Sequence, residues 1–143
     1  MSTPPTSYHV TGRGRTGGEA SIRAADHDIP IDASWASETP SGFPGPAELL
    51  AAAFAACLLK NMERAATLLP FRYERVEVDV VARRQDAPPR FVELTYEVRV
   101  VTDEDPRRVE LLHRNLSQFG TIYNTLAASC DVHGTVVAVP PHP

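Results

Sequence analysis

Two cysteines, Cys57 and Cys130, carry the clearest capacity for covalent chemistry in this sequence of 143 residues. Because two cysteines are too few for a disulfide framework, three interpretations are open: two buried apolar side chains, one redox pair, or one functional thiol beside an inert one. A thiol in apolar surroundings needs a nearby cation to become reactive. Lys60, one helical turn after Cys57, or an arginine from another segment is a candidate for that cation.

Two other patterns resemble binding motifs but lack the context that those motifs require. Residues 12–17 spell G-x-G-x-x-G, yet a strand is expected to follow, so we interpret residues 12–18 as a glycine turn that carries Arg13 and Arg15. An arginine on a tight turn is well placed to project into a cleft. Cys130 and His133 have the spacing of metal ligands, but residues three apart on a strand point to opposite faces. We therefore expect neither a dinucleotide cofactor nor a metal.

The composition is typical of a globular domain and excludes several classes of function. With 43% hydrophobic and 22% charged residues, we predict a single domain over residues 1–143 with flexible tails at 1–7 and 140–143. A net charge of -4, with scattered basic residues, argues against binding to nucleic acid. No apolar run reaches the length of a membrane span, and no signal-peptide pattern opens the chain. We therefore expect a cytoplasmic protein that does not bind membranes.

Residues 46–68 form the most informative segment, because their alanine and leucine content predicts a long helix that begins at Pro46. From Leu49 to Leu59 no polar residue interrupts this helix, so it offers no face to water. Other structure must therefore cover it on every side. One small domain covers such a helix with difficulty, which favours a homodimer.

The remaining segments predict an α+β domain. Alternation of apolar and polar residues in 71–80 and 91–100 predicts a long antiparallel pair with one solvent face. Pro30 places the third early strand at an edge or a bulge. The expected order is β-β-β-α-β-β-α-α-β, with strands near 8–11, 19–24 and 28–33, helices at 106–118 and 121–128, and a last strand at 132–139.

Residues 45–57, GPAELLAAAFAAC, resemble the N-P-E-E-L…A-C signature of the OsmC/Ohr family, the osmotically inducible and organic hydroperoxide resistance proteins. The predicted order of elements is also similar to that of this family. The resemblance implies an OsmC-like fold, in which antiparallel sheets surround the long helix within an intertwined homodimer. It further implies a role in oxidative or osmotic stress and an active site at the dimer interface.

In peroxidases of this family, a helix cysteine attacks an organic hydroperoxide with the help of an arginine from the N-terminal strands. By resemblance, Cys57 occupies the peroxidatic position. Residues 14–17, G-R-T-G, resemble the family's G-R-D-G turn, which makes Arg15 the matching arginine and Arg13 the alternative. The family also has a glutamate ten residues before the cysteine. That position falls on Ala47, and Glu48 lies about 100° further around the helix.

The resolving cysteine of the family stands in a C-P-V-S segment, and here Gly120 takes its place. Cys130 lies ten residues later, beyond a short predicted helix. A helix of two turns displaces it by more than about 10 Å, whereas a disulfide needs Cα atoms within about 7 Å. We therefore expect no disulfide between Cys57 and Cys130, and we interpret Cys130 as a bystander.

Two hypotheses for function follow. The first is a thiol-dependent, peroxiredoxin-like peroxidase that reduces lipophilic organic hydroperoxides through Cys57 and is regenerated by an external thiol reductant. The second is a non-catalytic homodimer that binds a small hydrophobic ligand in its interface pocket, with Cys57 as a packing residue.

Overall fold

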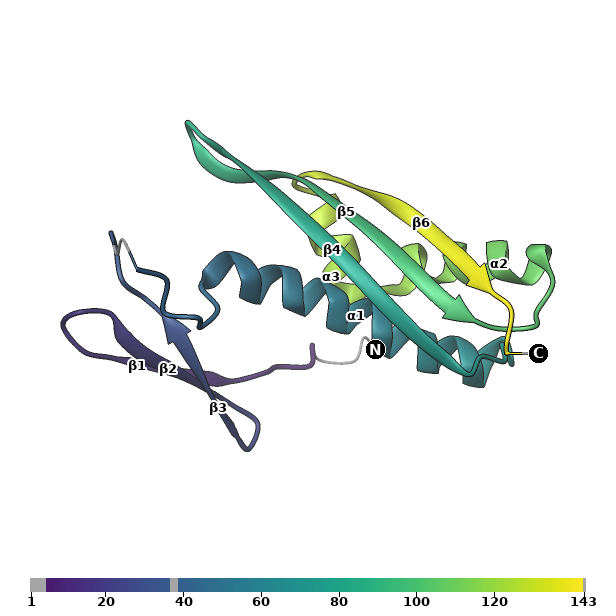
Figure 1. Cartoon of the computed structure of the whole chain (residues 1–143), viewed down its shortest axis with the longest axis horizontal. Coiled ribbons are helices and arrows are strands. Elements are labelled where there is room, and N and C mark those ends of the chain that lie inside the picture. The colour runs from purple at the N-terminus through teal and green to yellow at the C-terminus, as the bar shows by residue number, and fades with distance from the viewer. Residues whose placement is uncertain (1–4, 37–38, 143) are drawn as a thin grey trace. The chain divides into compact units, whose positions relative to one another are not determined.

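The computed structural model describes residues 5–36 and 39–142 (Figure 1). Their elements follow the predicted α+β order. The chain divides into two compact units, and the boundary between Leu49 and Leu50 lies inside the first helix. A single domain over the whole chain stays a prediction, as does flexibility of the tails, of which residues 1–4 and 143 lie outside the described residues. The elements are β1 (Val10–Gly14), β2 (Glu19–Ala24), β3 (His27–Asp32), α1 (Pro46–Leu68), β4 (Arg75–Asp86), β5 (Pro89–Val101), α2 (Pro106–Phe119), α3 (Thr121–Ala127) and β6 (Asp131–Val139).

The first unit contains an antiparallel sheet in the order β1-β2-β3. The predicted turn at residues 12–18 was too long, because β1 runs to Gly14 and pairs with β2 despite the weak strand preference of glycine. The turn itself closes where Arg15 donates its N–H to Glu19, 2.9 Å away. Gly18 has a φ of +96°, and a Cβ there would lie 2.6 Å from the Cα of Ser34, so a side chain does not fit. Pro30 lies on β3, an edge strand of this sheet, as predicted.

The second unit contains a sheet in the order β4-β5-β6, with β5 in the middle (Figure 1). Strands β4 and β5 form the predicted long antiparallel pair, whereas β5 and β6 run parallel and are connected through α2 and α3. Side chains of β5 alternate between the two faces. One face carries ion pairs such as those of Arg99 with Asp79 and Glu97, at 2.7 and 2.8 Å. The opposite face is buried and contributes Leu94, Tyr96, Val98 and Val100 to the core.

Helices complete the core on the buried face of this sheet. Helix α2 begins as predicted, with Pro106 in its first turn and the Asp105 side chain accepting a hydrogen bond from the Arg108 N–H at 3.0 Å. Its buried stripe consists of Leu112 and Leu116, which join the hydrophobic core of the second unit. No helix among the described residues is long and apolar enough to cross a membrane.

Helix α1 buries only one stripe within a single chain. Phe54, Leu58 and Met62 recur every fourth residue and are fully buried. Ala53, Ala56 and Leu59 lie exposed on the same helix, and Leu59 keeps 42% of its surface in solvent. The expectation that residues 49–59 are covered on every side is therefore not met by one copy of the chain, because the sheet of the second unit covers one side only.

The buried stripe of α1 predicts a measurable difference between two leucines of that helix. Leu58 is fully buried and Leu68 is 60% exposed. Leu58→Ala removes packed methyl groups and leaves a cavity, so we expect a loss of about 3 kcal/mol in the free energy of unfolding. Leu68→Ala is the matched control and should cost about 0.5 kcal/mol or less. Urea unfolding followed by circular dichroism, at one protein concentration, measures both. Equal losses for the two variants would contradict this packing.

Candidate functional site

Cys57 lies near the middle of α1, with its thiol partly buried. Its sulfur accepts a hydrogen bond from the side-chain amide of Asn61, with 3.7 Å between Nδ2 and Sγ. Residues four apart are neighbours on a helix surface, so this spacing was available in the sequence, yet sequence reasoning missed Asn61. Lys60, which was considered as a cationic neighbour, is exposed. The side chain that contacts the thiol is therefore a neutral amide donor on the same helix.

Gly120 faces the same sulfur from the junction between α2 and α3. A Cβ placed on Gly120 would lie 3.0 Å from Cys57 Sγ and 3.1 Å from Asn61 Nδ2. It would also lie 2.9 Å from the Cβ of Tyr123, so the backbone of α3 packs closely here. The structure thus brings Cys57, Asn61 and Gly120 together. Because Gly120 has no side chain, its backbone can pack this closely against the thiol.

An aromatic cluster lies behind this junction. The ring of Phe54, one turn before Cys57, packs on Tyr123 with 5.5 Å between ring centroids, and on Tyr96 at 5.8 Å. The Tyr96 hydroxyl contacts His113 Nε2 at 2.7 Å and the Tyr123 hydroxyl at 3.2 Å. Burial lowers the pKa of His113 and raises the pKa of Tyr96, so both groups are neutral near pH 7. None of these residues was assigned to a site from the sequence.

Cys130 lies beyond α3, in different surroundings from Cys57. Its thiol lies 3.3 Å from the backbone carbonyl of Leu126 and packs against the core. Burial raises the pKa of this thiol, which disfavours the reactive thiolate. Both cysteines are free, and the inert role of Cys130 stays a prediction that its environment favours.

The first unit holds the arginine and glutamate candidates. Arg13 on β1 and Arg15 in the following turn line a pocket of about 650 Å³ together with Asp32. Hydrogen bonds from the Ser34 hydroxyl and N–H hold the pKa of the Asp32 carboxyl below its usual value. Glu48 accepts a hydrogen bond from the Gly45 N–H at 3.2 Å, at the start of α1. Its carboxylate therefore caps the helix, in the manner of the glutamate in a capping box.

The candidate residues thus form two groups, one in each unit. Cys57 and Gly120 belong to the second unit, where the structure adds Asn61. Arg13, Arg15 and Glu48 belong to the first unit. A contact between Arg15 and Cys57 stays a prediction.

The chain is similar in sequence and in structure to known proteins. The sequence profile of a family described as OsmC-like protein matches residues 39–133. An OsmC-like protein from Mycoplasma pneumoniae superposes with a TM-score of 0.82 at 16% identity, over 96% of this chain and 99% of that one. An organic hydroperoxide resistance protein OsmC from Legionella pneumophila gives a TM-score of 0.74 at 18% identity, over 93% and 99% of the two chains. The protein OhrB of Bacillus subtilis gives 0.69 at 21% identity, over 92% and 98%. A comparison with curated protein sequences gave no significant match.

The position of Gly120 predicts that a disulfide can be introduced there. In a disulfide, the Cβ of one cysteine lies about 3 Å from the sulfur of the other, because the S–S bond is about 2.0 Å long. The Cβ position at Gly120 lies 3.0 Å from Cys57 Sγ. We expect Gly120→Cys to form a disulfide with Cys57 on mild oxidation, after a small shift of Tyr123. Thiol counting and peptide mapping by mass spectrometry detect it.

The matched controls are the wild-type protein and the double variant Gly120→Cys/Cys57→Ser. Wild type should keep both thiols free of an intramolecular disulfide, and the double variant should not pair the introduced cysteine with Cys130. A disulfide between Cys57 and Cys130 in oxidised wild-type monomer would contradict this geometry. So would a Gly120→Cys protein in which all thiols remain free after oxidation.

Proposed function

The chain belongs to the family of OsmC-like proteins, and from this premise we propose that Cys57 reduces small organic hydroperoxides by a one-cysteine mechanism. The observation that carries the proposal is the Cys57 sulfur beside the Asn61 amide and the bare backbone of Gly120. Structural neighbours from Legionella pneumophila and Bacillus subtilis are named organic hydroperoxide resistance proteins, which supports this substrate class. We also propose a cytoplasmic location and a role in oxidative stress.

The chemistry begins with the thiolate of Cys57. Its sulfur attacks the terminal peroxide oxygen, an S–O bond forms as the O–O bond breaks, and the alkoxide takes a proton and leaves as an alcohol. Cys57 is oxidised to the sulfenic acid, and the hydroperoxide gains two electrons. One external thiol then attacks the sulfur and releases water. A second external thiol reopens the mixed disulfide and restores Cys57.

External thiols are needed because the residue that faces the Cys57 sulfur has no thiol. Gly120 holds that place, and Cys130 packs beside Leu126. Cys57 itself is only partly buried, which leaves its sulfenic acid within reach of an incoming thiol. The Asn61 amide, as a hydrogen-bond donor to sulfur, stabilises the negative charge of the Cys57 thiolate before it attacks. The apolar residues of α1 around Cys57 favour lipophilic hydroperoxides over hydrogen peroxide.

The proposal assigns the stabilising cation to Arg15, with Arg13 as the alternative. Both arginines line the pocket of the first unit, where the pocket wall also includes Phe43. A guanidinium near the sulfur favours the thiolate and attracts the polar end of a hydroperoxide. Within the second unit, the side chain that donates to the Cys57 sulfur is the neutral Asn61 amide, so the charge is assigned to another segment.

We further propose that the working protein is a homodimer in which the exposed stripe of α1 meets a second copy. Ala53, Ala56 and Leu59 present small and apolar side chains that one chain leaves in solvent. Small residues let two helices approach closely, and burial of the stripe removes apolar surface from water. In a symmetric dimer the same surface of each copy forms the interface, so we assign the partner of this stripe to the same stripe of a second copy.

The peroxidase proposal predicts that oxidation depends on Cys57 and not on Cys130. With cumene hydroperoxide and excess dithiothreitol, wild type and Cys130→Ser should consume peroxide at similar rates. Cys57→Ser should lose activity to the uncatalysed level, because it removes the nucleophile. Arg15→Met should lower kcat/KM by about tenfold or more, since a charge-assisted contact is worth more than about 1.4 kcal/mol. Stopped-flow absorbance measures the rates, and Arg23→Met is the matched arginine control.

If wild type consumes peroxide no faster than Cys57→Ser, the enzyme interpretation is wrong. The non-catalytic dimer that binds a small hydrophobic ligand then becomes the better account. Its support would be saturable binding of an apolar fluorescent probe that Cys57→Ser leaves unchanged. The partly exposed thiol and its amide donor favour the peroxidase.

The dimer proposal predicts that a charge on the exposed stripe of α1 separates the copies. Wild type should sediment as a dimer at micromolar concentration, and Ala56→Arg should shift it toward monomer while far-ultraviolet circular dichroism stays unchanged. Thr67→Arg, at an exposed position near the end of the same helix, is the control and should remain dimeric. Sedimentation velocity measures the three proteins. A monomeric wild type would overturn this proposal.

A further inference from the structure

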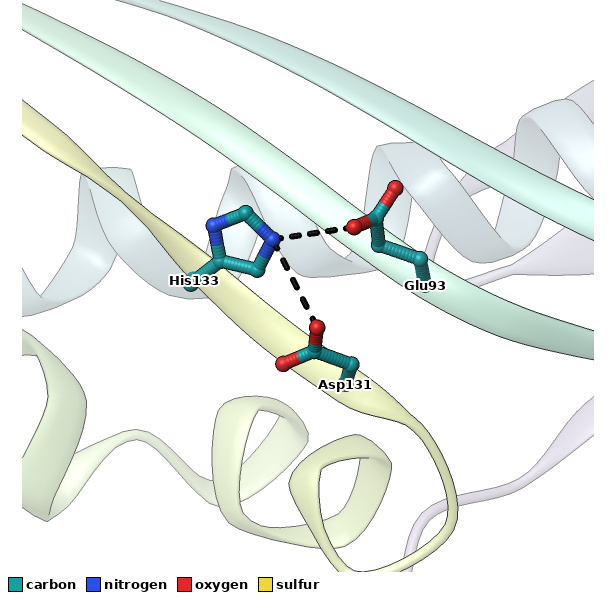
Figure 2. A group of neighbouring side chains, drawn as sticks. All are labelled: Glu93, Asp131 and His133. Atoms are coloured by element: carbon teal, nitrogen blue, oxygen red, sulfur yellow. Dashed lines mark hydrogen bonds and ion pairs between the residues drawn. The ribbon is translucent and has the colours of Figure 1, made fainter.

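A second group of chemically capable side chains lies on the sheet of the second unit, on the face opposite the core. Glu93 projects from β5, and Asp131 and His133 project from the adjacent strand β6, so that the three converge (Figure 2). The parallel register pairs Glu93 with Asp131 and Thr95 with His133. Residues two apart on a strand share a face, which explains why Asp131 and His133 meet the Glu93 carboxylate.

The distances within this group suit a metal ion. His133 Nε2 lies 3.0 Å from a Glu93 carboxylate oxygen and 3.6 Å from an Asp131 carboxylate oxygen. One ligand atom from each residue lies within 4.8 Å of the others. Ligands of a tetrahedral zinc ion, with bonds of about 2.0 to 2.1 Å, stand about 3.3 Å apart. Small side-chain movements therefore suffice to enclose an ion between the three donors.

The donor types select a class of metal. Imidazole nitrogen suits zinc, copper and nickel, whereas magnesium and calcium prefer sites made only of oxygen. Two carboxylates supply the negative charge that a divalent cation needs. Arg83 contacts the other oxygen of Glu93, with 3.0 Å between Nε and Oε1. That contact fixes the orientation of the carboxylate and leaves Oε2 directed at His133, as an outer partner of a metal ligand does.

We propose that Glu93, Asp131 and His133 bind one divalent transition-metal ion of the zinc class, with water completing its coordination. Among the described residues, this is the one group of three or more histidine, cysteine, aspartate or glutamate side chains close enough together to hold an ion. The expectation of no metal rested on pairing His133 with Cys130. In the structure Cys130 packs against the core, and His133 instead meets Asp131 and a residue of the neighbouring strand.

Without a metal, the three side chains form an ion-paired cluster. The hydrogen bond with Glu93 raises the pKa of His133, and the same contact lowers the pKa of Glu93. A metal must displace the imidazole proton, so binding is measured under mildly alkaline conditions. Both carboxylates and the imidazole remain accessible, since the group lies on an exposed face.

The test is calorimetric titration of the full chain with zinc chloride, in a buffer that does not chelate and without an affinity tag. Cys57→Ser/Cys130→Ser serves as the background, because free thiols bind zinc. We expect one equivalent to bind. His133→Gln, Glu93→Gln and Asp131→Asn should each weaken binding at least about tenfold, because each removes one ligand. His27→Gln and Glu97→Gln are matched controls on exposed strand positions and should leave binding unchanged.

Nuclear magnetic resonance distinguishes zinc binding at this site from nonspecific binding elsewhere on the protein. Zinc should shift the ring signals of His133 at one equivalent, whereas magnesium at the same concentration should not. The proposal is overturned if the protein shows no saturable zinc binding. It is also overturned if His133→Gln, folded by circular dichroism, binds as tightly as the background protein, or if His27→Gln loses binding to the same extent.

Discussion

The packing of one stripe of α1 against the sheet of the second unit is the constraint on which the rest depends. Phe54, Leu58 and Met62 are fully buried, and their burial fixes the rotation of the helix about its axis. That rotation sets Cys57 and Asn61 beside the junction of α2 and α3, where the backbone of Gly120 packs closely against the sulfur. The same rotation turns Ala56 and Leu59 toward solvent. The burial of one stripe of α1 thus positions both the thiol site and the exposed stripe that we propose as the dimer contact.

Much of the fold follows from local sequence patterns. The long helix has the predicted bounds, because alanine and leucine favour helix and Pro46 suits its first turn. Alternation along β4 and β5 predicted their pairing and the exposed face. The first strand was predicted too early in the chain, because Gly12 and Gly14 favour a turn locally. In the structure, pairing with β2 makes both glycines part of the strand. Cross-strand pairing of this kind is not contained in the sequence of one segment.

The candidate site was predictable only in part. Resemblance to a family singled out Cys57 and Gly120, and the structure places these two residues in proximity. The contact of Asn61 with Cys57 could have been predicted from helical periodicity, because the two residues are four apart on α1. The contact of Tyr96 with His113 joins residues that are distant in sequence. Glu93 and His133 likewise meet only because β5 and β6 run parallel in one register. Such groupings depend on topology, which spacing along a chain does not encode.

The central claim is that Cys57 acts as a nucleophile toward organic hydroperoxides. Its most direct test is to expose the reduced protein to one equivalent of cumene hydroperoxide, trap sulfenic acid with dimedone and locate the adduct by mass spectrometry. The account predicts a stoichiometric adduct at Cys57 and an unmodified Cys130 thiol. An adduct confined to Cys130, or the absence of any adduct while peroxide persists, would contradict it.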